Sequence, residues 1–209
     1  MAQHSADIVI LGGGIAGLWT LAHLRSLGYN ALLLEKTALG GGQSIASQGI
    51  IHSGLKYALA GQVSSLAQSI SAMPEAWRAA LRGEGPVNLS AARTNAESQM
   101  LLIPKGFMGG IINVVAKQTL GGRDVELPAE LAAAGFDGRA VVMGEPVLDI
   151  PSVIEALAAQ HADCIRQGES AEGINFKKLI VTAAGNNAAL ADQNGHSEGL
   201  KTQARPLLM

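Results

Sequence analysis

A glycine-rich turn lies between two short apolar runs near the beginning of the chain, and few folds accommodate this arrangement. The segment Asp7–Lys36 reads DIVILGGGIAGLWTLAHLRSLGYNALLLEK. Short, branched and uniformly apolar runs such as 8–11 and 31–34 are typical of parallel strands that are buried on both faces. Between them, an amphipathic segment that ends at Gly28 predicts a helix. Its predicted buried face consists of Ile15, Leu18, Leu21, Ala22 and Leu24.

The glycines of the turn follow the spacing G-x-G-x-x-G, at Gly12, Gly14 and Gly17. In this motif the first glycine permits a tight turn, the second lets a pyrophosphate approach the backbone, and the third lets helix and strand pack closely. The helix that begins there directs unpaired N–H groups and a positive dipole end at the phosphates, so no basic side chain is needed. Because a strand precedes the motif and a helix follows it, the pattern predicts a dinucleotide site.

An acid follows the second apolar run at the distance that such a site requires. Glu35 lies eighteen residues after Gly17, where a carboxylate can accept hydrogen bonds from both hydroxyls of an adenosine ribose. A carboxylate there disfavours a 2′-phosphate on the same ribose, which makes NADP the least favoured dinucleotide. The alternative interpretation is a strand–helix–strand unit with a purely structural role.

Composition and charge limit the class of protein. The chain has 209 residues, of which 48% are hydrophobic and only 3% aromatic, and this suits one layered α/β domain or one domain and part of another. A net charge of −2 gives no electrostatic reason to expect nucleic acid or an anionic membrane as a partner. A single cysteine, Cys164, excludes an internal disulfide. Without a targeting signal or a membrane span, we expect a cytoplasmic protein.

Further elements follow from the pattern of apolar residues, glycines and prolines. For the helix at 149–161, Ser152 and Glu155 fit a capping box. In the helix at 64–82, Pro74 is expected to bend or split the helix. The other predicted elements are helices at 107–120 and 129–134 and strands at 100–103, 140–143, 147–150 and 178–183.

The segment after Glu35, TALGGGQSIASQGIIHSGLKYALAG, is rich in glycine and serine but also contains Ile50, Ile51 and Tyr57. Small residues with free N–H and hydroxyl groups can surround a phosphate-bearing ligand closely. A flexible linker is the alternative, but linkers seldom contain such an apolar run. We therefore interpret this segment as one that lines a ligand.

With these motifs in place, the sequence resembles the D-amino-acid-oxidase-like superfamily of FAD-dependent oxidoreductases. Within it, SQGIIHSGLKYALAG is most similar to the glycerol-3-phosphate dehydrogenase and 2-hydroxyglutarate oxidase branch. The segments EPVLD (145–149), IVTAAGN (180–186) and QARPLLM (203–209) also resemble segments of that superfamily, in the expected order. The resemblance implies FAD as the cofactor.

The resemblance also implies a set of site residues. Gly12, Gly14 and Gly17, with Ile15 and Ala16, would face the pyrophosphate, and Glu35 with Lys36 the adenosine ribose. The segment after the second strand would lie along the phosphates, the ribityl chain and then the flavin ring, and the far strand would close the site. These residues are Gly42, Gln43 and Ser44, then Ser47, Gln48, Gly49 and Ile50, and finally Ala183, Ala184 and Gly185.

The implied fold is α/β: a Rossmann-like FAD-binding domain with a parallel sheet, plus part of an α+β substrate domain. We predict the FAD-binding domain at 1–82 and 145–190 and the partial substrate region at 83–144 and 191–209. Members usually have an antiparallel meander before the strand at 178–183, but only 162–177 is available here, too short for three strands. Because the sequence stops soon after a segment that enters the substrate domain in relatives, we expect a truncated copy.

The implied activity is the transfer of a hydride to FAD from a CH–OH or CH–NH substrate, such as a 2-hydroxy acid, a glycerol-3-phosphate-like compound or an amino acid. His52 is the one candidate catalytic residue, as an acid or base at the substrate. It could instead attach the flavin covalently or have a structural role. The sequence contains no metal-ligand cluster. Three alternatives remain: a non-catalytic flavin-binding remnant, an NAD-dependent dehydrogenase, or a non-catalytic interaction module with hydrophobic surface for a partner chain. The sequence leaves the oligomeric state open.

Overall fold

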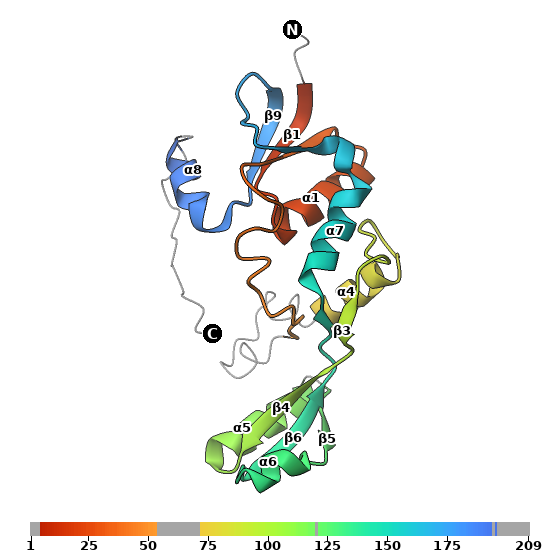
Figure 1. Ribbon diagram of the computed structural model, residues 1–209, viewed down its shortest axis with the longest axis vertical. Coiled ribbons are helices and arrows are strands. Elements are labelled where there is room, and N and C mark those ends of the chain that lie inside the picture. The colour runs from red at the N-terminus through yellow and green to blue at the C-terminus, as the bar shows by residue number, and fades with distance from the viewer. Residues whose placement is uncertain (1–4, 54–71, 120, 194, 196–209) are drawn as a thin grey trace. The chain divides into compact units, whose positions relative to one another are not determined.

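The structure is a computed structural model, and it describes residues 5–53, 72–119, 121–193 and 195 (Figure 1). The chain divides into two compact units. The first unit comprises Met1–Ser47, Glu84–Ala91 and Ile150–Met209, and the second comprises Gln48–Gly83 and Ala92–Asp149. Residues 64–71 of the predicted helix at 64–82 and the segment at 203–209 lie outside the described residues.

A parallel sheet of four strands forms the centre of the first unit. Its strands are β1 (Ser5–Leu11), β2 (Ala31–Glu35), β8 (Ile165–Gln167) and β9 (Asn175–Val181), in the spatial order β8-β2-β1-β9. Every neighbouring pair is parallel. In chain order the arrangement is 3-2-1-4, as in one half of a doubly wound α/β fold. The predicted α/β class with a parallel sheet is therefore confirmed.

Helices cover one face of this sheet. Helix α1 (Ile15–Ser26) contacts β1, β2 and α7 (Ile150–Gln160). Of the predicted buried face of α1, Leu18, Leu21 and Ala22 are fully buried, whereas Ile15 and Leu24 are half-buried. Gly28 ends the helix as predicted: its φ is +86° and its N–H donates to the Arg25 carbonyl.

The opposite face of the sheet packs against the connection between β8 and β9. Ala171 and Ile174 of this connection contact a cluster formed by Ala6, Val9 and Leu34. The connection has only the residues 168–174, and β8, the short strand that precedes it, was absent from the sequence predictions. After β9 the chain forms a short 3-10 turn (Ala184–Asn186) and helix α8 (Asn187–Gln193).

The predicted capping box at Ser152 and Glu155 is wrong. Helix α7 begins at Ile150, so Ser152 lies within its first turn and is buried. Residues 64–71 lie outside the described part of the chain, so the bend or split expected at Pro74 stays a prediction. In the structure Pro74 stands in the first turn of α4 (Met73–Leu81). Proline is well tolerated there, since the first turn needs no backbone donor.

The second unit contains two antiparallel sheets. One pairs β3 (Thr94–Ala96) with β7 (Val147–Leu148), and the other has the order β4-β6-β5. The bounds are Gln99–Pro104 for β4, Gly138–Met143 for β6, and Arg123–Val125 for β5. Helix α5 (Phe107–Val114) continues into a π-helix (Val115–Thr119), and α6 (Ala129–Ala133) follows β5. A core of Ile103, Ala116, Val141 and Met143 holds this sheet to the helical segment.

The compact units divide the chain at other points than the predicted domains. Two backbone hydrogen bonds join distant segments within the second unit: the Ile51 N–H donates to the Pro146 carbonyl, and the Leu148 N–H donates to the Gly49 carbonyl. They connect residues 48–53 with residues 146–148. Both segments belong to the second unit, although the prediction places both in the FAD-binding domain. The functional division of the chain stays a prediction.

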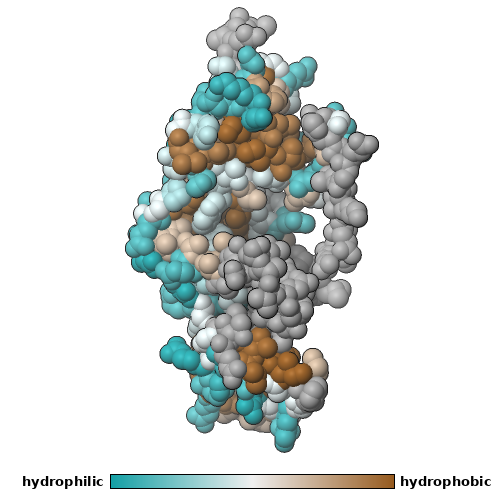
Figure 2. Space-filling model, turned by 180° about the vertical axis from the view of Figure 1, so that it is seen from behind, coloured by the Kyte–Doolittle hydropathy of each residue, from teal (hydrophilic) through white to brown (hydrophobic). Residues whose placement is uncertain are grey.

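Apolar side chains are also exposed on both units, and Figure 2 shows them as brown areas. In the second unit they belong mainly to α5 and β4, and include Met100, Leu102, Met108, Ile111 and Val114. No helix within the described parts of the chain combines the length and the apolar character needed to cross a membrane.

Candidate cofactor site

The candidate site lies at the carboxyl ends of the parallel strands in the first unit. From β1 the chain continues to β2 on one side, while β9 pairs with β1 on the other side. Such a change of direction opens a crevice between the connections, and in open α/β sheets ligands bind there. The glycine-rich turn, which follows β1 directly, stands at this point.

Close packing explains two of the three motif glycines. Gly12 has a φ of +110°, and a side chain on it would lie 2.7 Å from the Thr182 carbonyl oxygen. A Cβ on Gly17 would lie 1.9 Å from the Gly12 carbonyl oxygen. That same oxygen accepts a hydrogen bond from the Thr182 hydroxyl at 3.0 Å. The turn, α1 and the end of β9 therefore pack so closely that no side chain fits at Gly12 or Gly17.

Helix α1 begins at this turn with its amides toward the crevice. Gly14 is the N-cap residue and supplies no side-chain cap. Instead the Ser44 hydroxyl accepts a hydrogen bond of 3.0 Å from the Ile15 N–H. Backbone N–H groups in the first turn of a helix have no partner within the helix, and the helix dipole adds positive potential beside them. This end of α1 is therefore suited to bind phosphate oxygens.

Glu35 is held in a fixed position at the end of β2. Its Oε2 accepts from the Gly13 N–H at 2.6 Å, and its Oε1 accepts from the N–H and hydroxyl of Thr37 at 2.8 and 3.0 Å. Partial burial disfavours the charged form, but these hydrogen bonds outweigh it and lower the pKa of Glu35. A carboxylate has about four accepting positions, so Glu35 can still accept from a ribose hydroxyl.

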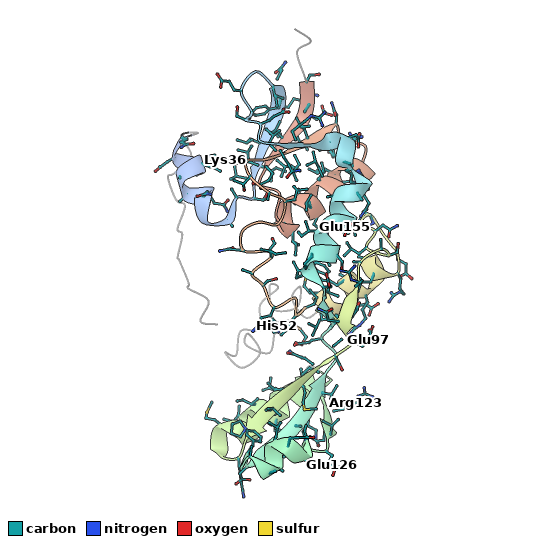
Figure 3. The ribbon with its side chains drawn as sticks, in the orientation of Figure 1. Lys36, His52, Glu97, Arg123, Glu126 and Glu155 are labelled. Carbon is teal, nitrogen blue, oxygen red and sulfur yellow. The ribbon has the colours of Figure 1, made fainter. Side chains whose placement is uncertain are left out.

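These elements surround a cleft of about 850 Å³, within the size range of cofactor pockets. Lys36, labelled in Figure 3, is among the residues that line it. The predicted site residues that line the cleft are Gly12, Gly14, Ala16, Glu35, Lys36, Gly42, Gln43, Ser44, Ala183 and Ala184.

Sequence reasoning missed part of the wall. Thr182, the residues 168–171 and several residues of α8 also line the cleft. Residues 168–171 follow β8, and the carboxyl end of a parallel strand is where ligand-binding loops occur; recognising that strand would have indicated them. Ala184 has a φ of +49°, a conformation that is costly for a residue with a side chain and that often marks a functional site.

The remaining predicted residues do not line this cleft. Ile15, Gly17, Ser47 and Gly185 belong to the first unit but stand outside the wall. Gln48, Gly49 and Ile50 belong to the second unit. There Gly49 accepts from the Leu148 N–H, and Ile50 forms an isolated bridge with Val147. Their predicted proximity to a flavin ring stays a prediction.

A second polar cluster surrounds Glu145 in the second unit. The side chain of Glu145 is only 3% exposed. Its Oε1 accepts from the N–H and hydroxyl of Ser53 at 2.6 and 2.5 Å. Its Oε2 accepts from the Gln99 side-chain amide and lies 3.2 Å from His52 Nδ1. Figure 3 labels His52. The segment EPVLD begins at Glu145, but no sequence signal connects Glu145 with His52.

The two titratable groups of this cluster shift each other's pKa. Burial opposes ionisation of Glu145, but hydrogen bonds from His52 and Ser53 outweigh it and lower the pKa of Glu145 to about 2. The hydrogen bond to Glu145 raises the pKa of His52, against a smaller opposing effect of burial. Glu145 is therefore ionised at neutral pH.

The first unit has the features that a dinucleotide requires. The crowded glycine turn, the amides of α1 and the fixed carboxylate of Glu35 stand around a single cleft. The helix end suits the pyrophosphate and the acid suits the ribose. Among the described residues, no group of three or more His, Cys, Asp or Glu is arranged to hold a metal ion.

Comparison with known families is consistent with this geometry. A family model described as FAD dependent oxidoreductase (DAO) matches residues 7–206. The chain belongs to this family. The match confirms the predicted family and its cofactor, FAD. When bound, FAD accepts a hydride, and the protein has to bind and orient the reactants.

A curated relative covers nearly the whole chain. In an alignment of 226 positions, the chain is 37% identical to a probable FAD-dependent oxidoreductase of Pseudomonas aeruginosa. The alignment covers 98% of this chain and 58% of the relative. In the crystal structure of that relative, the match has a TM-score of 0.71 at 32% identity and covers 95% of this chain and 53% of the other. The chain thus spans little more than half the length of this relative.

Two more distant structures share the fold. The glycine oxidase of Geobacillus kaustophilus matches with a TM-score of 0.69 at 17% identity, covering 92% of this chain and 59% of that one. The dithionite-reduced L-alpha-glycerophosphate oxidase of Mycoplasma pneumoniae, which has FAD bound, matches with a TM-score of 0.62 at 17% identity, covering 90% and 56%.

Proposed function

We propose that this chain binds FAD in the cleft of the first unit and takes part in the oxidation of a small CH–NH substrate of the amino acid class. The observation that carries the proposal is the convergence of the glycine turn, the end of α1 and Glu35 on one cleft. The amides of Gly14 and Ala16, which line the cleft, would bind the pyrophosphate, and Glu35 the ribose. Relatives named for amino acid and glycerophosphate oxidation support a CH–NH or CH–OH substrate.

Removal of a hydride from a CH–NH carbon also requires that a proton leave the nitrogen. His52 is the residue that we propose for this role, because a neutral imidazole is a suitable base near neutral pH. Its side chain is 62% exposed, so it is open to a substrate. The family resemblance implies that residues 47–50, just before His52, approach the flavin ring.

Flavin binding is tested by the visible spectrum of the purified full chain, recorded before and after acid precipitation. We expect flavin absorbance that stays in the supernatant, which indicates non-covalent FAD. Flavin retained in the precipitate would reveal covalent attachment. A chain that binds no flavin under any reconstitution, or that binds NAD in its place, would contradict the proposal.

The cleft is tested by a pair of acid-to-neutral variants. Glu35→Ala removes the fixed carboxylate, and we expect it to weaken FAD binding at least about 10-fold, the effect of one lost charge-assisted hydrogen bond. Glu155→Ala, at an exposed position of α7, makes the same change in charge away from the cleft and should leave FAD affinity unchanged. Fluorescence titration of the apoprotein with FAD measures both. Equal affinities for the two variants would refute the assignment.

The substrate class is tested under anaerobic conditions with the flavin-loaded chain. Bleaching of the flavin absorbance by glycine or another amino acid, and not by glycerol 3-phosphate or 2-hydroxy acids, is the expected result. Bleaching by a hydroxy acid alone would replace the CH–NH class with the CH–OH class. Flavin that no compound of the panel reduces would indicate a binding-only chain and refute the oxidase proposal.

A further inference from the structure

The carboxylate of Glu145 has all of its accepting positions filled. An ionised carboxylate has about four such positions and no proton to donate. Ser53 fills those of Oε1 with its N–H and hydroxyl. Gln99 and His52 fill those of Oε2. Glu145 stands between β6 and β7, and its partners come from β4 and from the segment before residue 54.

This occupancy determines the state of His52. Because an ionised Glu145 can only accept, the atom of His52 that faces it, Nδ1, must carry a proton. In the neutral imidazole the other nitrogen, Nε2, then has the free lone pair. The ring is 62% exposed although the carboxylate is 3% exposed, so one nitrogen is anchored and the ring remains accessible.

We infer that Glu145 is a positioning residue for His52, which holds the ring by Nδ1–H and leaves Nε2 as the proton acceptor for the substrate. This inference rests on the proposed function of His52. Ser53 and Gln99 hold the carboxylate in turn, so the geometry does not depend on His52 itself. A buried charge costs several kcal/mol unless it is paired and hydrogen-bonded, and the described ion pairs give Glu145 one partner that becomes cationic when protonated, His52.

A purely structural role of Glu145 can be distinguished by measurement from a positioning role for His52. Glu145 also connects residues 52 and 53 to β4 and to the end of β6, and any group of the same shape that makes those bonds would preserve the connection. Such a role needs no negative charge and no particular tautomer. Another charged group nearby is Arg78 of α4, whose guanidinium donates to the Gly144 carbonyl. The tautomer of His52 therefore separates the two roles.

The first experiment is nitrogen-15 NMR of the histidine rings in the full chain, without flavin. In the wild type we expect His52 to be protonated at Nδ1 when neutral. In Glu145→Gln, which keeps the shape but removes the charge, we expect a lower titration midpoint and loss of the fixed tautomer. Glu75→Gln is the control, because Glu75 forms exposed ion pairs with Arg78 and Arg82 on α4. It should leave His52 unchanged.

The wild-type spectrum alone can overturn the inference, even if a variant fails to fold. A neutral His52 protonated at Nε2, or one that exchanges freely between tautomers, would refute it. An unchanged titration midpoint in folded Glu145→Gln would do the same. None of these results depends on flavin or substrate, so the inference and the proposed function can fail separately.

The second experiment is the rate of anaerobic flavin reduction by the amino acid that bleaches the wild type. General base catalysis contributes about 10²–10⁴-fold, so we expect His52→Gln to lose about 100-fold and Glu145→Gln about 10-fold. Residues that act as a unit are non-additive, and the double variant should therefore be no slower than His52→Gln. Additive losses would show that Glu145 acts independently of His52.

Discussion

Replacement of Gly17 by alanine is expected to disrupt the junction between β1, α1 and β9. The new Cβ would lie 1.9 Å from the Gly12 carbonyl oxygen and 2.7 Å from the Thr182 hydroxyl oxygen. Ordinary contact begins at 3.4 Å, so the first pair must separate by about 1.5 Å. Both obstacles are part of the turn and of the end of β9, so the added methyl group cannot turn away.

The cost follows from the bonds that such a movement breaks. The Gly12 carbonyl accepts from the Thr182 hydroxyl, and the Gly12 N–H donates to the Leu34 carbonyl. Each hydrogen bond contributes about 0.5–1.5 kcal/mol and overpacking costs about 1–3 kcal/mol. We expect the free energy of unfolding to fall by about 3 kcal/mol. For a chain of this size that lowers Tm by roughly 6–12 °C.

Denaturant and thermal unfolding of the full chain measure this change, and FAD titration reports on the site. Gly110→Ala is the matched control, because Gly110 lies in α5 and a Cβ there meets nothing within 4 Å. We expect that variant to be stabilised by about 0.5–1 kcal/mol, as for glycine to alanine in an open helix position. If Gly17→Ala unfolds within about 0.5 kcal/mol of the wild type and binds FAD equally well, the close approach that we describe does not exist.

Three further outcomes are expected. Ser44→Ala should destabilise the chain by about 1 kcal/mol, because its hydroxyl caps α1 at the Ile15 N–H, and denaturant unfolding measures this. Ala184→Gly should raise Tm slightly, because glycine adopts the φ of +49° at this position without strain. We expect this gain to exceed the added conformational entropy of the unfolded chain by about 0.5 kcal/mol; a lower Tm would show that Ala184 is not strained. The pKa of Glu145 lies at about 2 in the folded chain, against an ordinary 4.5, so its contribution of about 3 kcal/mol is present above pH 4.5 and lost as pH falls toward 2. Glu145→Gln should flatten this part of the stability–pH curve.

The first strand–helix–strand unit could be predicted from the sequence because its determinants are contiguous. The apolar run of β1, the glycine spacing and the position of Glu35 all fall within Asp7–Lys36, and each has a local physical meaning. The Gly28 helix end and the strands at 100–103 and 140–143 followed in the same way, from a turn residue and from short apolar runs.

The parts that could not be predicted depend on contacts between distant segments. Glu145 and His52 are 93 residues apart, and no sequence signal connects the two. Strand β8 has only three residues and gains its identity from pairing with β2. The capping box at Ser152 is wrong because α7 begins two residues earlier, at Ile150, which places Ser152 on the buried side of the first turn.

The pairing of β1 with β9 has a consequence for synthesis of the chain on the ribosome. Ser5 pairs with Asn175, so β1 has no neighbour on one edge until nearly the whole of this sequence has been translated. Translation of this length takes roughly 10–30 s at ordinary elongation rates. During that interval the nascent protein displays the bare backbone of SADIVIL, and unpaired strand edges invite aggregation. Production of soluble material should therefore respond to chaperone supply and growth temperature more than to substitutions in the second unit.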